Sequence, residues 1–314
     1  GHGAPMNRTD ESPTSADGYA GLGGLARPLL KIGWMALVAS DALRKMLHIH
    51  RPRETEAGAA DRAYSRSLDA LVNAIERAPG SGERMARAIA GAMEEAGRSF
   101  DAVPVDGSRD LLFIGVVGEI FCRLDTFSNE DLIRSLEKFG AMAWLSDVSE
   151  WVWYTDVERV RNLRGSGRTF SLEMAGALLK RSLQRHYENK ILAPLHDRLK
   201  VMPEPHDIME VLRCGEPYLP WQGALGEMAL SAGKSVYMHG KGVDGIIDIS
   251  PFTCMNGIVA EAVYPRISRE HDDIPIRTFY FDGTNRDLES ELSVFVELAR
   301  GYNRNKRRQD RISA

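Results

Sequence analysis

A strand that leads into a helix through a single cysteine organises the C-terminal part of this chain. Residues 245–249 carry three isoleucines and predict a buried strand, and Pro251 follows at a point where ladder pairing should stop. Cys254 comes next, and from Met255 to Ile267 apolar residues recur at helical spacing. This order predicts that Cys254 lies at the carboxyl edge of an open α/β sheet, where ligands bind in such folds. The N–H groups of a helix N-terminus favour a thiolate there; alternatively, Cys254 is a small buried apolar residue.

Four apolar runs alternate with helical patterns, which predicts one parallel sheet. The runs begin near residues 111, 141, 245 and 276, and the first, LLFIGVVGEI, is typical of a strand buried on both faces. Right-handed crossovers join such strands. The fold class is therefore α/β: a four-stranded parallel Rossmann- or flavodoxin-like sheet with flanking helices and an N-terminal helical segment. Helices are predicted over residues 28–47, 61–78, 81–97, 129–139, 172–199, 205–213, 217–232 and 285–302. The aromatic alternation in SEWVWYTD makes residues 149–168 look irregular.

Composition divides the chain into four parts. Residues 1–24 are rich in Gly, Ser, Pro, Ala, Asp and Thr, which predicts a disordered linker or a remnant of expression. Residues 25–105 form a helical segment, residues 106–303 the α/β domain, and residues 304–314 a basic, solvated tail. The character of the first part suggests that the chain is the C-terminal piece of something longer.

Charge and cysteine content exclude several classes of protein. The net charge is −4, so no nucleic-acid partner is expected. The sequence has no run of 18 apolar residues, so no membrane span is expected, and three cysteines without a CxxC pair predict a reducing, cytoplasmic location. The GxGxxG match at residues 240–245 precedes a strand instead of following one, which is the wrong context for a dinucleotide fingerprint.

Polar residues cluster directly after the first two predicted strands. Glu119, Arg123 and Asn129 follow the first strand, and Glu150 with Trp151 follows the second. Strands of a parallel sheet end at the same edge, so these side chains should gather near Cys254. The structural alternative is an ion pair or helix cap for the first group and a polar cap beside a packed tryptophan for the second.

Three stretches resemble the acyl-CoA dehydratase activase-related proteins. They are GEIFCRLDTFSNEDLIRSLEKFGAMAWLSDVSEW at 118–151, the segment 226–283, and HRPRETEAGAADRAY at 50–64. The core of the second, DGIIxIxPFxCM, is fairly specific, and the resemblance covers most of residues 28–300. These proteins are related to subunits of 2-hydroxyacyl-CoA dehydratases, which carry a [4Fe–4S] cluster held by three cysteines.

The resemblance implies an iron–sulfur role for this chain in a 2-hydroxyacyl-CoA dehydratase or activase system, which is a lyase-type redox system. Cys254 would be one metal ligand. The residues that would line the adjacent cofactor-binding cleft are Glu119, Arg123, Asn129 and Glu150. The resemblance also implies an activating ATPase domain or protein as partner and an acyl-CoA as substrate, and it identifies no catalytic residue.

The resemblance leaves the ligand set incomplete. Cys122 and Cys214 do not match ligand positions, so a missing segment or a partner chain would complete the cluster, since clusters are normally anchored by several thiolates. The alternative from another class is a non-catalytic docking or scaffold module that has the same fold without a cluster. Iron content separates the two hypotheses. A third hypothesis is a flavodoxin-like flavin-binding protein, but the sequence has no phosphate-binding loop to support it.

Overall fold

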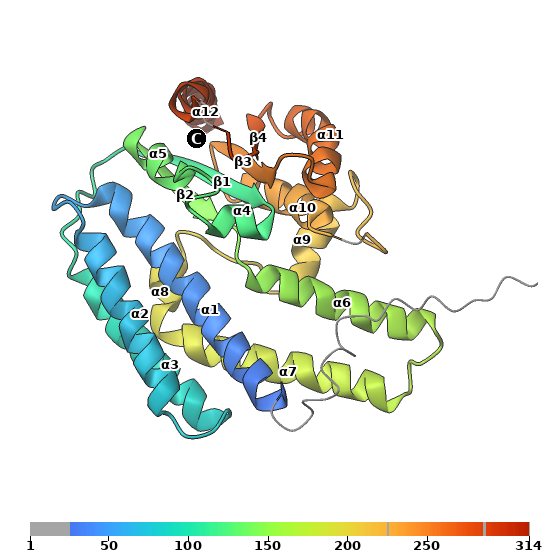
Figure 1. The fold of residues 1–314 in the computed structure, drawn as a ribbon. Coiled ribbons are helices and arrows are strands. Elements are labelled where there is room, and N and C mark those ends of the chain that lie inside the picture. Colours follow the sequence, from blue (N-terminus) through green and yellow to red (C-terminus); the bar gives the residue numbers. More distant parts are fainter. Residues whose placement is uncertain (1–25, 225, 285–286, 314) are drawn as a thin grey trace, which may run out of the picture.

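One all-parallel, four-stranded sheet forms the centre of the molecule. The computed structural model describes residues 26–224, 226–284 and 287–313, so the predicted linker at 1–24 lies outside the described residues. The strands are β1 (Leu112–Gly118), β2 (Ala141–Leu145), β3 (Gly245–Pro251) and β4 (Ile276–Phe281). Their spatial order is β2-β1-β3-β4, with Ile114 opposite Gly245 and Pro251 opposite Phe281 (Figure 1). The predicted α/β class with four parallel strands and an N-terminal helical segment is confirmed.

Helices cover both faces of the sheet, and successive side chains along a strand point to opposite faces. Ile114 and Val116 of β1 face a cluster formed with α5 and α12, whereas Val117 faces the larger cluster on the other side. Gly115 allows α10 to pack closely on β1, because a Cβ there would press on the sulfur of Met238. The helices around the sheet are α4 (Ile120–Leu124), α5 (Leu132–Lys138), α9 (Ile208–Gly215), α10 (Met228–His239), α11 (Met255–Glu270) and α12 (Leu288–Ser313).

A helical body packs beneath one face of the sheet (Figure 1). Its members are α1 (Ala26–His50), η2 (Arg51–Arg53), α2 (Ala59–Arg77), α3 (Glu83–Asp101), α6 (Ser149–Gly165), α7 (Leu172–Leu192), η3 (Ala193–Leu195) and α8 (His196–Leu199). One hydrophobic cluster runs from Trp34 of α1 through Trp144 of β2 to Ile246 of β3. The helical body and this face of the sheet therefore share one core. None of the described helices has the length and apolar character that a membrane crossing requires.

Three predicted segments differ from the structure. The helix predicted over residues 217–232 lies further along the chain, as α10 from Met228 to His239. Residues 149–165 form the regular helix α6, since Trp153, Val157 and Val160 are buried at helical spacing and the Trp153 ring meets that of Trp34 edge-on at 5.2 Å. The predicted solvated tail instead continues α12 to Ser313.

Ion pairs hold the extension of α12 against the domain. Lys306 pairs with Asp244, and Arg307 pairs with Asp110. Continued helical periodicity puts Asn303 on the same face as Lys306, and the Asn303 amide donates to Asp244 over 2.8 Å.

Candidate functional site

Cys254 occupies the N-cap position of α11, directly after the carboxyl end of β3. The Cys254 amide donates to the carbonyl of Pro251 over 3.0 Å, and Thr253 reaches the left-handed region with φ 68° to make this tight turn. The thiol is half-buried. The predicted strand–proline–cysteine–helix order is therefore confirmed, and Cys254 lies at the carboxyl edge of the sheet.

Glu119 caps α4 at the end of the neighbouring strand. Its carboxylate accepts hydrogen bonds from the amides of Phe121 at 3.1 Å and Cys122 at 2.7 Å. Gly118 precedes it with φ 113°, and a Cβ at Gly118 would collide with the carbonyl oxygen of Ile249. β1 and β3 can thus approach each other at this edge only because residue 118 is glycine.

Cys122 lies close enough to Cys254 for the two thiols to interact electrostatically. Burial, then the Glu119 carboxylate and then Cys254 raise the pKa of Cys122 to about 11. Cys122 is buried and stays a protonated thiol at neutral pH. A metal ligand must be a thiolate, so the surroundings of Cys122 disfavour ligation.

Arg123 is buried in the wall of a small cavity behind this edge. Its Nη1 donates to the carbonyl of Ser146 over 2.6 Å, whereas its Nε and the hydroxyl of Ser146 have no hydrogen-bond partner among the described residues. The cavity has a volume of about 10 Å³, and its lining also includes Glu150 and Glu227. This volume suits one water molecule or one hydroxyl oxygen.

An open groove of about 760 Å³ lies next to this inner cavity. Glu119, Phe121 and Asn256 line the groove, while Trp151 and Glu227 line both the groove and the cavity. Burial raises the pKa of Glu227 to about 7, although the Arg123 guanidinium lowers it. Glu119 thus lines the groove, and Arg123 and Glu150 line the inner cavity. Asn256 also lines the groove, whereas Cys254 lines neither space.

Asn129 lies away from the groove and the inner cavity, at the junction between α4 and α5. Its side-chain amide donates to the carbonyl of Cys122 over 2.7 Å, and its carbonyl oxygen accepts from the amide of Leu132 at 3.3 Å. It lines neither the groove nor the inner cavity. Asn129 therefore holds α4 against α5 and supports Cys122 from behind.

Glu150 is buried at the start of α6 and pairs with Lys234 of α10. Lys234 also pairs with Glu204, which comes from the connection between α8 and α9. The sequence analysis missed Glu204, Glu227 and Lys234. The nearest signal was the GE pair at residues 226–227, which repeats the GE pair at residues 118–119.

The described residues do not provide a complete cage for a [4Fe–4S] cluster. Cys214 lies in the last turn of α9, and its electrostatic neighbours are Glu210 and Lys241, neither of which lines the groove. No group of three or more His, Cys, Asp or Glu side chains within the described ranges is placed to hold a metal ion. A three-cysteine site therefore does not fit this part of the chain by itself.

Comparison of the chain with protein-family models, with curated proteins and with solved structures found no significant match.

Proposed function

We propose that this chain supplies one wall of an iron–sulfur site in a 2-hydroxyacyl-CoA dehydratase or activase-type system, with Cys254 as the ligand that it contributes. The observation that carries the proposal is the position of Cys254 at a helix N-cap on the carboxyl edge, two residues before Asn256, which lines the open groove. A helix N-terminus presents unpaired N–H groups and the positive end of the helix dipole to a negatively charged ligand set. Glu119 and Arg123 would line the cofactor-binding side, with Glu150 behind them.

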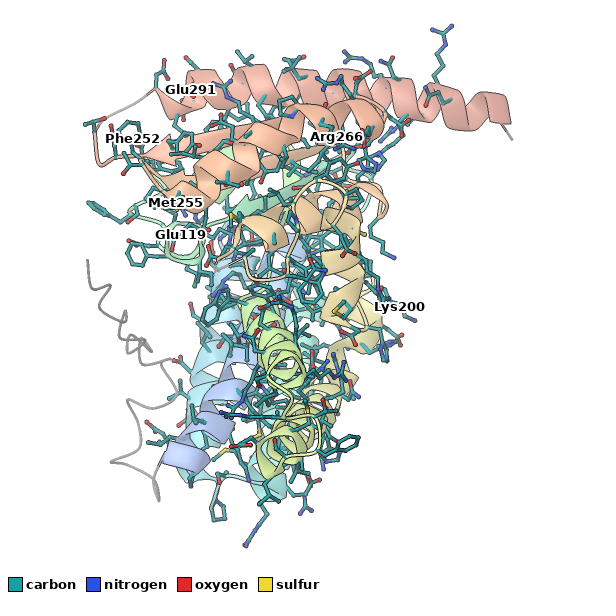
Figure 2. The ribbon with its side chains drawn as sticks, turned by 90° about the vertical axis from the view of Figure 1, so that its right-hand side faces the viewer. Glu119, Lys200, Phe252, Met255, Arg266 and Glu291 are labelled. Carbon is teal, nitrogen blue, oxygen red and sulfur yellow. The ribbon has the colours of Figure 1, made fainter. Side chains whose placement is uncertain are left out.

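A second polypeptide segment would cover this edge and complete the ligand set. The segments that follow β1 and β3 expose large apolar side chains to solvent: Phe127 is 91% exposed and Met255 is 75% exposed, and Phe121 and Phe252 are exposed as well. Figure 2 shows Glu119, Phe252 and Met255 on the same side of the molecule. Exposed apolar patches commonly mark protein–protein contacts. The covering segment would belong to an activating ATPase domain or protein, and an acyl-CoA would enter by the groove.

A cytoplasmic location accompanies this proposal. All three cysteines are free thiols, which suits a reducing compartment.

The second candidate function is a docking or scaffold module that holds no cluster. The ligand count favours it, because Cys122 is held as a buried thiol and Cys214 lies away from the groove. The exposed apolar loops would then serve the partner contact alone.

Anaerobic reconstitution of the full chain with iron and sulfide tests the two functions. We expect substoichiometric iron and sulfide with a broad charge-transfer absorbance that is lost in Cys254→Ser and unchanged in Cys214→Ser, the matched control. Equal iron content in wild type and Cys254→Ser would favour the scaffold. Four irons per chain, lost equally in Cys122→Ser, Cys214→Ser and Cys254→Ser, would overturn the view that the site is incomplete.

A further inference from the structure

The turn between α6 and α7 forms a tip of the helical body that lies away from the sheet. α6 and α7 lie side by side, and their joining loop is at the end far from the strands (Figure 1). We call residues 159–172, which include this loop, the basic tip. α6 has 17 residues and is therefore about 25 Å long, and Trp151 in its first turn lines the groove. The basic tip is thus a surface separate from the candidate site.

Positive charge is concentrated in the basic tip. This segment has four arginines and no Asp or Glu, although the whole chain has a net charge of −4. Arg161 pairs with Glu158 over 3.0 Å, and Arg168 lies 3.9 Å from Glu173 with most of its side chain exposed. Arg159 and Arg164 are exposed, and neither has an ion-pair partner in the part of the chain that the structure describes. The nearby carboxylates therefore leave two positive charges uncompensated.

Two large apolar side chains protrude among these arginines. Phe170 and Leu172 are 103% and 92% exposed. Leu172 begins a strip of apolar residues at helical spacing on the outer face of α7, which continues with Ala175 and Leu179, both exposed. The opposite face of this helix packs on the body through buried residues such as Met174. The outer face of α7 is therefore apolar exactly where the chain leaves it uncovered.

A local structural role does not account for the exposed phenylalanine. Ser171 caps α7, and its hydroxyl accepts from the amide of Met174 over 3.1 Å. A hydrophobic residue just before an N-cap commonly packs on the fourth residue of the helix, in a hydrophobic staple. Here these two residues are Phe170 and Ala175, and both are exposed, so Phe170 gains no burial from a staple.

We propose that the basic tip binds the surface of a membrane that contains anionic phospholipids, with Phe170 and Leu172 inserted among the lipids. The arginines would contact the headgroup phosphates, since a guanidinium matches phosphate oxygens in a bidentate arrangement. Basic residues beside exposed aromatic and aliphatic side chains are the combination that binds at the membrane interface. Such a contact needs no membrane-crossing helix, and the described helices include none.

The combination of charge and apolar surface favours a lipid bilayer over other anionic partners. A bilayer offers phosphates and, directly beneath them, an apolar layer that receives aliphatic side chains. A nucleic acid would pair with the arginines and stack on Phe170, but it would leave Leu172 and Leu179 in water, and the chain as a whole is acidic. An acidic protein surface would likewise satisfy the arginines alone. This inference is independent of the iron–sulfur proposal, because the groove and Cys254 lie at the other end of α6 or beyond it.

Co-sedimentation of the full chain with lipid vesicles tests the proposal. One set of vesicles contains only phosphatidylcholine, and the other contains equal parts of phosphatidylcholine and phosphatidylglycerol. We expect binding to the anionic vesicles that falls with added salt, because salt screens exposed charges, and little binding to the neutral ones. No binding to anionic vesicles at low salt, or equal binding to both kinds, would overturn the proposal.

A pair of arginine variants tests the electrostatic part. Arg164→Gln should weaken binding to anionic vesicles by about fivefold, the contribution of one basic residue near an anionic surface. Arg269→Gln is the matched control, because Arg269 is an exposed arginine of α11 that also has no ion pair among the described residues. An equal loss in the two variants would show that net charge, and not the basic tip, directs the binding, which would overturn the proposal.

A pair of phenylalanine variants tests insertion. Phe170→Ser should weaken binding to anionic vesicles by about tenfold, because the ring no longer leaves water. Phe127→Ser is the control, since Phe127 is just as exposed but lies at the carboxyl edge of the sheet, and it should leave binding unchanged. Thermal unfolding should be the same in both variants as in wild type, because both side chains lie in solvent. If Arg164→Gln weakens binding and Phe170→Ser does not, the partner is an acidic protein or a nucleic acid and the proposal fails.

Discussion

The region around Cys254 and the region around Lys234 differ in how far their side chains find partners within the chain. At the cysteine edge the segments that follow β1 and β3 expose Phe121, Phe252 and Met255, and the groove is open. Around Lys234 five charged side chains form ion pairs within the chain, and Lys234 itself is 1% exposed. We call them the charge network; they are Lys45, Asp147, Glu150, Glu204 and Lys234. The comparison teaches that the charges around Lys234 are paired within the chain, whereas the apolar side chains at the cysteine edge stay exposed.

The largest effect should come from Lys234→Met. Removing this ammonium leaves Glu150 and Glu204 without their shared cation, which should lower the free energy of unfolding by about 3–5 kcal/mol at neutral pH. Denaturant unfolding measures the change, and the loss should shrink in mild acid because the carboxyls can then protonate. Lys180→Met is the control, because Lys180 is half exposed, and it should cost about 1 kcal/mol or less. Equal losses in the two variants would contradict a closed charge network.

The next effect is a pH dependence of stability that Glu150 contributes. Its pKa in the folded chain, about 8, lies above the ordinary 4.5, so the folded state binds more protons between these values and its stability falls as pH rises through that window. The difference between wild type and Glu150→Gln isolates this contribution, which should be on the order of a few kcal/mol across the window. The lowered pKa of Glu204 acts only below 4.5, so it does not reverse the sign. Parallel stability curves for the two proteins would show that Glu150 is not a buried acid.

A smaller effect should follow from Gly118→Ala at the cysteine edge. Gly118 has φ 113°, and a Cβ there would meet the backbone of Ile249, so we expect a loss of about 1–3 kcal/mol in the free energy of unfolding. Gly91→Ala, inside α3 with open space around it, should instead stabilise the chain by about 0.5–1 kcal/mol. Thermal or denaturant unfolding of both variants measures the two changes in stability. An unchanged stability in Gly118→Ala would mean that β1 and β3 are not in close contact at residue 118.

The smallest effect on stability should come from the exposed loops. Phe252→Ser and Met255→Ser should each change the free energy of unfolding by about 0.5 kcal/mol or less, because both side chains are already in solvent. Both should nevertheless reduce binding of a hydrophobic dye, whereas Val294→Ser, an exposed position on α12, should not. A large stability loss in either loop variant would mean that the loop is already covered within this chain.

Periodicity predicted the four strands because their burial on both faces leaves a local apolar signature. It missed α6, where Trp153 and its neighbours read as aromatic alternation, since their burial depends on the distant Trp34. Glu119 and Arg123 were predicted at the edge because residues that directly follow a buried parallel strand have little choice of position. Asn129 lies a few residues further on, where the cap of α5 determines its contacts.

The sequence by itself therefore determined the parallel sheet and the place of Cys254 at a helix start, because strand, turn and helix follow one another within a few residues. Only the tertiary structure decided that Lys234 meets Glu150, which lies 84 positions away, and Glu204, which lies 30 positions away. The physical reason is that a buried charge finds its partner through the packing of separate elements, and no local periodicity records which partner that packing selects.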